Sequence, residues 1–186
     1  MTLKKKYSVL IGSDISVLVL ADILSDYGEK VLLVNKSAHW GQIFLGTKIK
    51  NETFDYGIVR HCLEHSAWPY MTLMEFNRIM KTGGRMYIEM PAPDGDRKLE
   101  HFQNHYSVMG QNMWGSLMIR AGFEYSSNTY DLKISTKDGS AQYKEPYHWY
   151  VITKIVDRSE YKPATGKYME ELVKEMAEFN KKNSPK

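Results

Sequence analysis

The chain has 186 residues, of which 42% are hydrophobic and 12% aromatic, so it is long and apolar enough to bury a core and is not a disordered segment. Its formal net charge of +3 is small and the lysines cluster only near the two ends, which argues against a nucleic-acid-binding surface. No apolar run reaches the ~20 residues of a membrane-spanning helix, no signal peptide precedes Tyr7, and Cys62 is the single cysteine. We therefore expect a cytoplasmic protein without a disulfide and without membrane contact.

Two short apolar runs in the first part of the chain predict buried parallel strands. They cover residues 7–11 and 31–34. Between them, a turn at residues 12–16 leads into a helix over residues 17–24, and Gly28 ends that helix. This order of elements predicts the nucleotide-binding half of a doubly wound fold.

The stretch from Phe54 to Pro93 predicts a second unit in which a helix connects two parallel strands. The run at residues 56–59 reads as a strand that ends in a cluster of polar side chains. Pro69 suits the first turn of the following helix, because that turn leaves its N–H groups unpaired. Glycines at 83 and 84 end the helix, and residues 85–90 form the next strand.

A polar loop over residues 92–106 precedes the elements that complete the predicted sheet. Residues 107–121 predict a helix whose inward side chains are Met109, Met113, Leu117 and Met118. Residues 123–135 and 148–156 predict an antiparallel hairpin around a turn at 137–140. Its apolar side is assigned to Tyr147, Trp149, Val151 and Ile155.

Together these elements predict an α/β fold, a Rossmann-like doubly wound and mostly parallel sheet with a terminal antiparallel hairpin and helices on both faces. One domain would cover residues 1–160. Residues 161–186 form a C-terminal amphipathic helix and tail, whose apolar stripe either docks on its own domain or makes a homodimer contact.

Motifs from Phe54 onward resemble class I S-adenosylmethionine-dependent methyltransferases. They are the FD and LEH motifs between Phe54 and His65, the glycine turn at 83–84, NHYSV at 104–108 and AGFE at 121–124, in the family's order. The resemblance covers roughly residues 54 to 156. It implies methyl transfer from S-adenosylmethionine to a small-molecule acceptor, although a fold-level likeness by itself does not fix a reaction.

The resemblance assigns cofactor contacts to Gly12, Ser13 and Asp14 in the first turn, to Asn35 after the second strand, and to Arg60 and His61. The chain departs from the family where a second glycine falls on Asp14 or Ser16 and where Asn35 replaces the acid that holds the ribose. An amide accepts a hydrogen bond less strongly than a carboxylate, so we expect weak binding of S-adenosylmethionine.

Residues 12–37 also resemble the FAD-binding start of flavin-dependent amine oxidases, but Asp14 and Val17 replace two of the glycines of that motif. We read the segment as a nucleotide-binding scaffold without its dinucleotide fingerprint. A degenerate, non-catalytic methyltransferase-like or nucleotide-binding domain that serves as an interaction module is therefore the alternative function.

The predicted catalytic residues are His61, Glu64 and His65, exposed at the mouth of the site just after the strand at 56–59. Imidazoles next to a carboxylate form a base and an orienting group for deprotonating an acceptor. His101 and His105 lie in the next loop and are expected near the same mouth. The structural alternative is that His61 and His65 only cap the ends of a strand and a helix.

The spacing of the histidines is one that is also found in metal sites. His61 and His65 are four residues apart, as are His101 and His105, and such pairs chelate an ion only on a helix. Because the first pair falls in a turn and the second in a loop, we predict no metal site.

Overall fold

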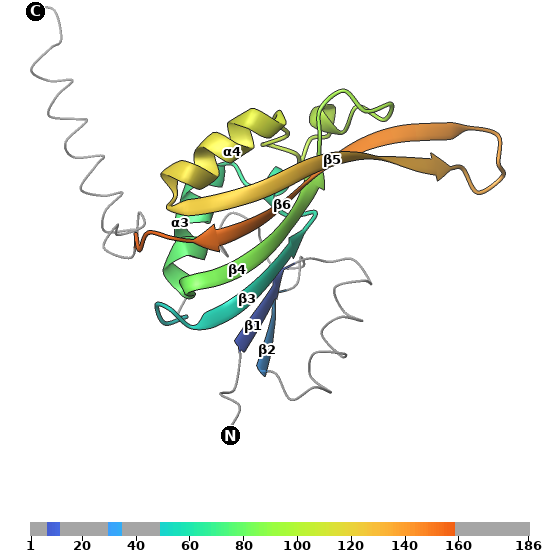
Figure 1. The fold of residues 1–186 in the computed structure, drawn as a ribbon. Coiled ribbons are helices and arrows are strands. Elements are labelled where there is room, and N and C mark those ends of the chain that lie inside the picture. The colour runs from blue at the N-terminus through green and yellow to red at the C-terminus, as the bar shows by residue number, and fades with distance from the viewer. Residues whose placement is uncertain (1–6, 12–29, 35–48, 159–186) are drawn as a thin grey trace, which may run out of the picture.

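The protein is represented by a computed structural model that describes residues 7–11, 30–34 and 49–158. Within these residues the strands form one six-stranded sheet in the order β2-β1-β3-β4-β6-β5 (Figure 1). The strands are β1 (Tyr7–Ile11), β2 (Lys30–Val34), β3 (Phe54–Arg60), β4 (Met80–Pro91), β5 (Phe123–Ser135) and β6 (Gln142–Lys154).

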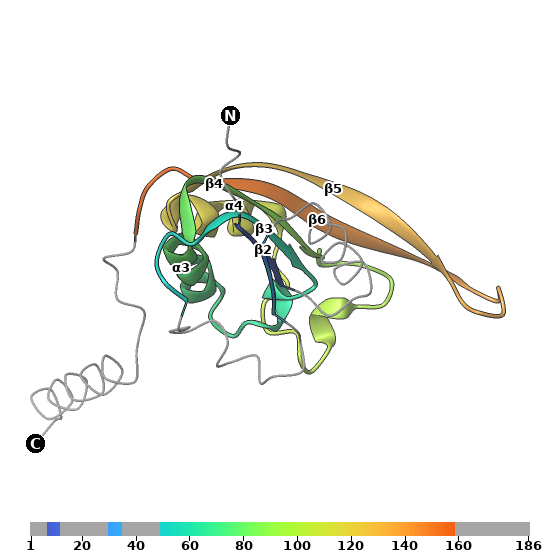
Figure 2. The same ribbon diagram turned by 90° about the horizontal axis from the view of Figure 1, so that it is seen from below.

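The sheet topology confirms the predicted fold class. The strands β1 to β4 pair in parallel, and β6 joins both β4 and β5 antiparallel. Helices α3 (Pro69–Ile79) and α4 (Gln111–Arg120) lie side by side on one face of the sheet (Figures 1 and 2). The helix predicted over residues 17–24 and the C-terminal helix predicted after residue 161 lie outside the described residues.

Helix α3 begins at Pro69 as predicted, whereas α4 begins four residues later than predicted. The reason is a tertiary contact. The backbone N–H of Ser107 donates to the carbonyl of Glu64 at 3.0 Å, and its hydroxyl donates to the carbonyl of Ser66 at 2.5 Å. These bonds hold the chain before Gly110 away from a helical conformation.

The inward face of α4 was also partly mispredicted. Trp114 and Met118 are fully buried, while Met113 is 55% exposed. Met109 and Leu117 are partly buried against the core. The buried pair is spaced i, i+4, so the helix turns Trp114 inward and Met113 outward.

The predicted apolar side of β6 was mostly wrong, since the core cluster takes Tyr150 and Ile152, and of the four predicted residues only Tyr147 is buried, outside that cluster. Side chains alternate between the two faces of a strand, and the even-numbered residues here face α3 and α4. Ile155 lies past the end of the strand and is 53% exposed.

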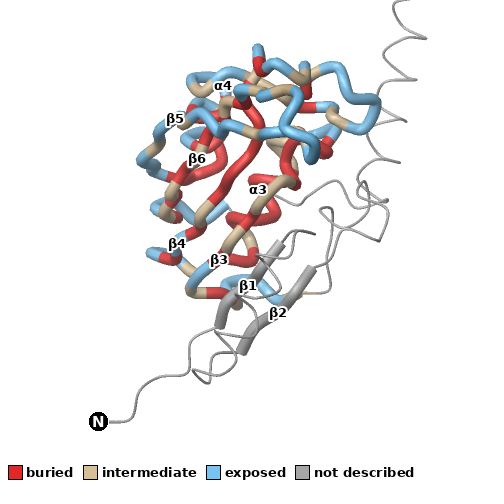
Figure 3. Tube along the Cα trace, turned by 90° about the vertical axis from the view of Figure 1, so that its right-hand side faces the viewer, coloured by how far each residue is buried: buried red, intermediate tan, exposed pale blue. Residues whose placement is uncertain are grey.

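The hydrophobic core lies between the sheet and the two helices, where buried segments of β3, β4, β6 and α3 meet (Figure 3). From the strands it takes Val59, Met86, Ile88 and Met90, and from the helices Leu73, Phe76, Trp114 and Met118.

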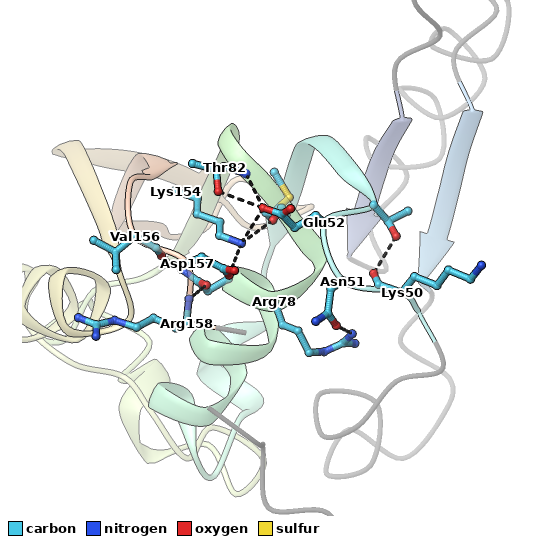
Figure 4. Close-up of polar contacts among 12 residues, drawn as sticks. Lys50, Asn51, Glu52, Arg78, Thr82, Lys154, Val156, Asp157 and Arg158 are labelled. Carbon is cyan, nitrogen blue, oxygen red and sulfur yellow. Dashed lines mark hydrogen bonds and ion pairs between the residues drawn. The ribbon is translucent and has the colours of Figure 1, made fainter. Parts of the chain in front are cut away.

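A buried lysine secures the amino-terminal edge of the sheet (Figure 4). Lys154 is fully buried at the end of β6, and its Nζ donates to the carbonyl of Met80 at 3.0 Å and to Asp157 Oδ1 at 2.8 Å. Glu52 Oε1 lies 3.5 Å from the same nitrogen. This cluster is at the start of β4, so it lies at the opposite edge from the carboxyl ends of the parallel strands.

Candidate functional site

The candidate site lies at the carboxyl ends of β3 and β4. In open α/β sheets ligands bind outside the carboxyl ends of the strands, where successive loops converge. Here Arg60 ends β3 beside Glu89, its register partner on β4. Because Ile11 pairs with both Val59 and Val34, β1 and β2 end at this same edge.

Glu89 is the centre of a polar cluster on the sheet face opposite α3 and α4. It is 4% exposed, and Arg60 donates to its Oε1 through Nε at 3.0 Å and through Nη2 at 2.7 Å. The Tyr87 hydroxyl donates to Oε2 at 2.5 Å, and His61 Nε2 lies 3.4 Å from Oε1. Burial alone would raise the pKa of Glu89, but His61, Tyr87 and Arg60 together lower that pKa to about 2.

Three tyrosines surround this carboxylate and remain protonated at neutral pH. Burial, followed by the charge of Glu89, raises the pKa of Tyr130 to about 12. Burial and the hydrogen bond to Glu89 raise the pKa of Tyr87, and burial raises that of Tyr147. The ring of Tyr147 stacks on Tyr130 at 5.8 Å and meets His61 edge-on at 5.1 Å. The neutral phenol groups of these tyrosines therefore line this side of the site.

His61 has an unusual backbone conformation, with a φ of +49°. Non-glycine residues adopt this left-handed region rarely, and such outliers concentrate at functional sites. Its backbone N–H donates to the carbonyl of Glu89 at 3.0 Å, which fixes the bend at the end of β3. The side chain is 31% exposed and lies between two carboxylates, with Nδ1 3.9 Å from Glu64 Oε1.

Glu64 and His65 belong to a short 3₁₀ turn, Leu63–His65, and both are buried, with 2% and 6% of their surface exposed. The expectation that they are exposed at the mouth was therefore wrong. His65 Nδ1 lies 2.7 Å from the carbonyl of Asn104, in the loop that follows β4. The loop after β4 covers this turn through Asn104 and His105.

The structure brings together Arg60, His61, Glu64 and His65, the predicted site residues that it describes. Of the two loop histidines, His105 packs edge-on against His65 with ring centres 4.7 Å apart. The side chain of His101 is 77% exposed, so it is not part of the cluster. The predicted cofactor residues Gly12, Ser13, Asp14 and Asn35 lie outside the described residues.

Glu89 was missed by the sequence reading, together with the tyrosines around it. The available signal was a lone carboxylate within the otherwise apolar run of β4. A charge in a central strand is rarely buried without a partner, so it marks a polar site.

Comparisons with known proteins establish the fold. No protein-family model and no curated protein matches the sequence. The candidate methyltransferase BH2331 of Bacillus halodurans C-125 has a TM-score of 0.60 at 12% identity, covering 83% of this chain and 94% of that one. A SAM-dependent methyltransferase of Archaeoglobus fulgidus scores 0.59 at 13% identity, covering 81% and 86%.

A third similar structure, the cyclase SpnF, scores 0.51 at 12% identity and covers 82% of this chain and 75% of its own. The chain thus has a class I methyltransferase-like fold, as the motifs implied, and that fold supports more than one reaction. Among the described helices, none is both long and apolar enough to cross a membrane.

Proposed function

We propose that this protein transfers the methyl group of S-adenosylmethionine to a small-molecule acceptor. The observation that supports this function is the polar cluster of Arg60, His61, Glu64 and Glu89 at the carboxyl edge of a methyltransferase-like sheet. Similarity of fold alone does not identify a reaction. A buried carboxylate beside a partly exposed imidazole, in contrast, is an arrangement that an enzyme can use to remove a proton from its substrate.

The described residues at this edge suit the methionine end of S-adenosylmethionine. The side chains of Arg60 and His61 are 27% and 31% exposed, and the Arg60 guanidinium is the group that can bind the methionine carboxylate through charge-assisted hydrogen bonds. We assign Gly12, Ser13, Asp14 and Asn35 to the same ligand on the resemblance in sequence. When bound, S-adenosylmethionine supplies an electrophilic methyl group.

His61 is the proposed general base, in preference to His65. Its ring is partly exposed, and Glu89 beside Nε2 favours a proton on that nitrogen, leaving Nδ1 as the acceptor of the substrate proton. His65 is buried and its Nδ1 faces the Asn104 carbonyl, so its proposed role is to hold the site in place and not to contact the acceptor. Glu64 Oε1 lies 3.9 Å from His61 Nδ1, where its negative charge stabilises the imidazolium that forms once His61 has taken the proton.

The acceptor is proposed to be a small molecule, and the protein to act in the cytoplasm without nucleic-acid or membrane partners. The single cysteine, Cys62, is a buried thiol outside any disulfide, which suits a reducing compartment. A homodimer through the C-terminal segment stays a prediction, to be checked by light scattering.

Calorimetric titration of the full chain with S-adenosylmethionine and S-adenosylhomocysteine tests the proposal. We expect binding of both, weaker than micromolar, because a lost charged hydrogen bond costs on the order of 1.5–3 kcal/mol, or at least tenfold in affinity. Binding of neither ligand would contradict the proposal and favour the non-catalytic interaction module.

Turnover gives a second, residue-specific test. Formation of S-adenosylhomocysteine is measured with a panel of small hydroxyl- and amine-bearing acceptors for the native protein, His61→Ala and His101→Ala. Loss of one acid–base group costs roughly a hundredfold in rate, so His61→Ala is expected to lose most activity. His101→Ala is the matched control, since its exposed ring lies outside the cluster. Equal activity of all three proteins would remove His61 from the mechanism.

A further inference from the structure

Next to His61 the structure assembles a set of donors that the sequence spacing did not indicate. One ligand atom from each of Glu64, His65 and His105 lies within 4.8 Å of the other two. His65 belongs to one of the two i, i+4 pairs and His105 to the other, so the folded chain brings together one histidine from each pair. We propose that these three side chains bind one divalent first-row transition-metal ion such as Zn²⁺.

The donor chemistry fits such an ion. Two imidazole nitrogens and a carboxylate oxygen are ligands that zinc and its neighbours accept, and three protein ligands leave a position open for water or a small molecule. Bonds of roughly 2.0–2.1 Å in tetrahedral geometry place ligand atoms about 3.3 Å apart. His65 Nε2 is already 3.8 Å from Glu64 Oε1, so small side-chain rotations complete the site.

The orientation of His65 is the one that a metal ligand requires. Its Nδ1 lies 2.7 Å from the Asn104 carbonyl, which can only accept, so that nitrogen carries the proton. In the neutral imidazole the lone pair is then on Nε2, the atom that faces Glu64. Histidines that bind metals commonly donate their other N–H to a backbone carbonyl in this way.

Hydrogen bonds within the protein hold the backbone around the three donors. The carbonyl of Glu64 accepts from the N–H groups of Tyr106 at 2.7 Å and Ser107 at 3.0 Å. The hydroxyl of Ser107 donates to the carbonyl of Ser66. These bonds join the 3₁₀ turn to the loop that carries His105, so the donors belong to a single preformed site.

Burial gives the ion a physical role. Glu64 is 2% exposed, and a carboxylate at this depth is costly unless positive charge compensates it. A divalent ion between Glu64 and two neutral imidazoles supplies that charge. The alternative is a buried Glu64–His65 ion pair without metal, which makes different predictions for the same variants.

The test uses the untagged full chain, stripped with a chelator, dialysed and titrated with Zn²⁺ alone in a calorimeter. We expect one ion per chain and a rise in melting temperature on binding. Glu64→Gln, His65→Ala and His105→Ala should each weaken binding at least tenfold and lose the thermal shift. Circular dichroism establishes that each variant is folded, and Glu64→Gln retains the native side-chain volume.

His101→Ala is the matched control, because its exposed ring lies four residues from His105 in the same loop. It should bind Zn²⁺ as the native chain does. Absence of stoichiometric binding to the native protein would overturn the proposal, as would unchanged binding by all three donor variants. No methyl donor is present in this titration, so its outcome is independent of the proposed methyl transfer.

Discussion

At the scale of single residues, Glu89 makes stability depend on pH. Its pKa is about 2 against an ordinary value of 4.5, so the folded state holds the proton less tightly than the unfolded chain. A lowered pKa stabilises the fold fully above about pH 4.5, and this contribution is lost as the pH falls toward 2. We expect Glu89→Gln to lower the free energy of unfolding at pH 7 by about 1–3 kcal/mol and to flatten its decline in acid.

Urea unfolding at pH 7, 4 and 3 measures both effects. Glu124→Gln is the control, because Glu124 is an exposed carboxylate on β5. An unchanged acid slope in Glu89→Gln would mean that folding does not lower the pKa of Glu89.

Asn35 is the second residue whose substitution has a predicted effect, here on the affinity for S-adenosylmethionine. If the resemblance in sequence assigns it correctly to the ribose, Asn35→Asp restores a charged acceptor and should tighten S-adenosylmethionine binding about tenfold or more. The same titration with Asn104→Asp controls for added negative charge. Sub-micromolar binding by the native chain would show that other contacts already compensate for the missing acid.

At the scale of elements, Gly122 determines how α4 passes into β5. Its φ is +90°, and an added Cβ would lie 2.6 Å from the Val156 carbonyl oxygen. We expect Gly122→Ala to cost at least about 1–2 kcal/mol in thermal or urea unfolding, since the left-handed conformation alone accounts for that much. Gly110→Ala is the comparison variant, because Gly110 has a φ of −64° and no neighbour within 4 Å of an added Cβ. It caps α4, so it should lose only the N-cap preference for glycine over alanine, roughly 0.5–1 kcal/mol. Equal stability of the two variants would contradict this reading.

The strands and the start of α3 were predictable because their signals are local. Apolar runs and Pro69 each act within a few residues. The glycines at 83 and 84 did not mark the end of the helix as predicted, because α3 ends at Ile79 and both glycines lie inside β4. The start of α4 was not predictable, since it depends on Ser107 bonding to the turn that holds Glu64. The inward face of β6 was mispredicted because its apolar and polar side chains do not alternate clearly in the sequence.

The same distinction applies to the site. The polar residues after β3 were located by their position at the end of a buried run. His101 and His105 were both expected near them, and the folded loop shows that of these two only His105 joins the cluster. Glu89 comes from β4, so only its register with Arg60 reveals it. Long-range pairing is the information that a single sequence does not contain.

At the scale of the whole molecule, the hairpin of β5 and β6 extends past the rest of the sheet (Figures 1 and 2). Pairing between β4 and β6 stops at Pro91 and Tyr147, whereas β5 and β6 remain paired out to Ser135 and Gln142. Amide hydrogens near the tip should therefore exchange orders of magnitude faster than those of Tyr150 and Ile152. Exchange measured by mass spectrometry or NMR tests this, and equal protection along β6 would show that something else covers the tip.

The turn at the tip of the β5–β6 hairpin is a suitable position for inserting a label. Its residues 137–140 are exposed, and the loop is closed by its own bonds, such as the 2.9 Å bond from the Thr136 N–H to the Ala141 carbonyl. Exposed tips with local bonding tolerate insertions better than other positions do. A short peptide epitope or a fluorophore inserted between Asp138 and Gly139 would thus report on this protein's encounters with ligands while Arg60, His61 and Glu89 keep their native surroundings.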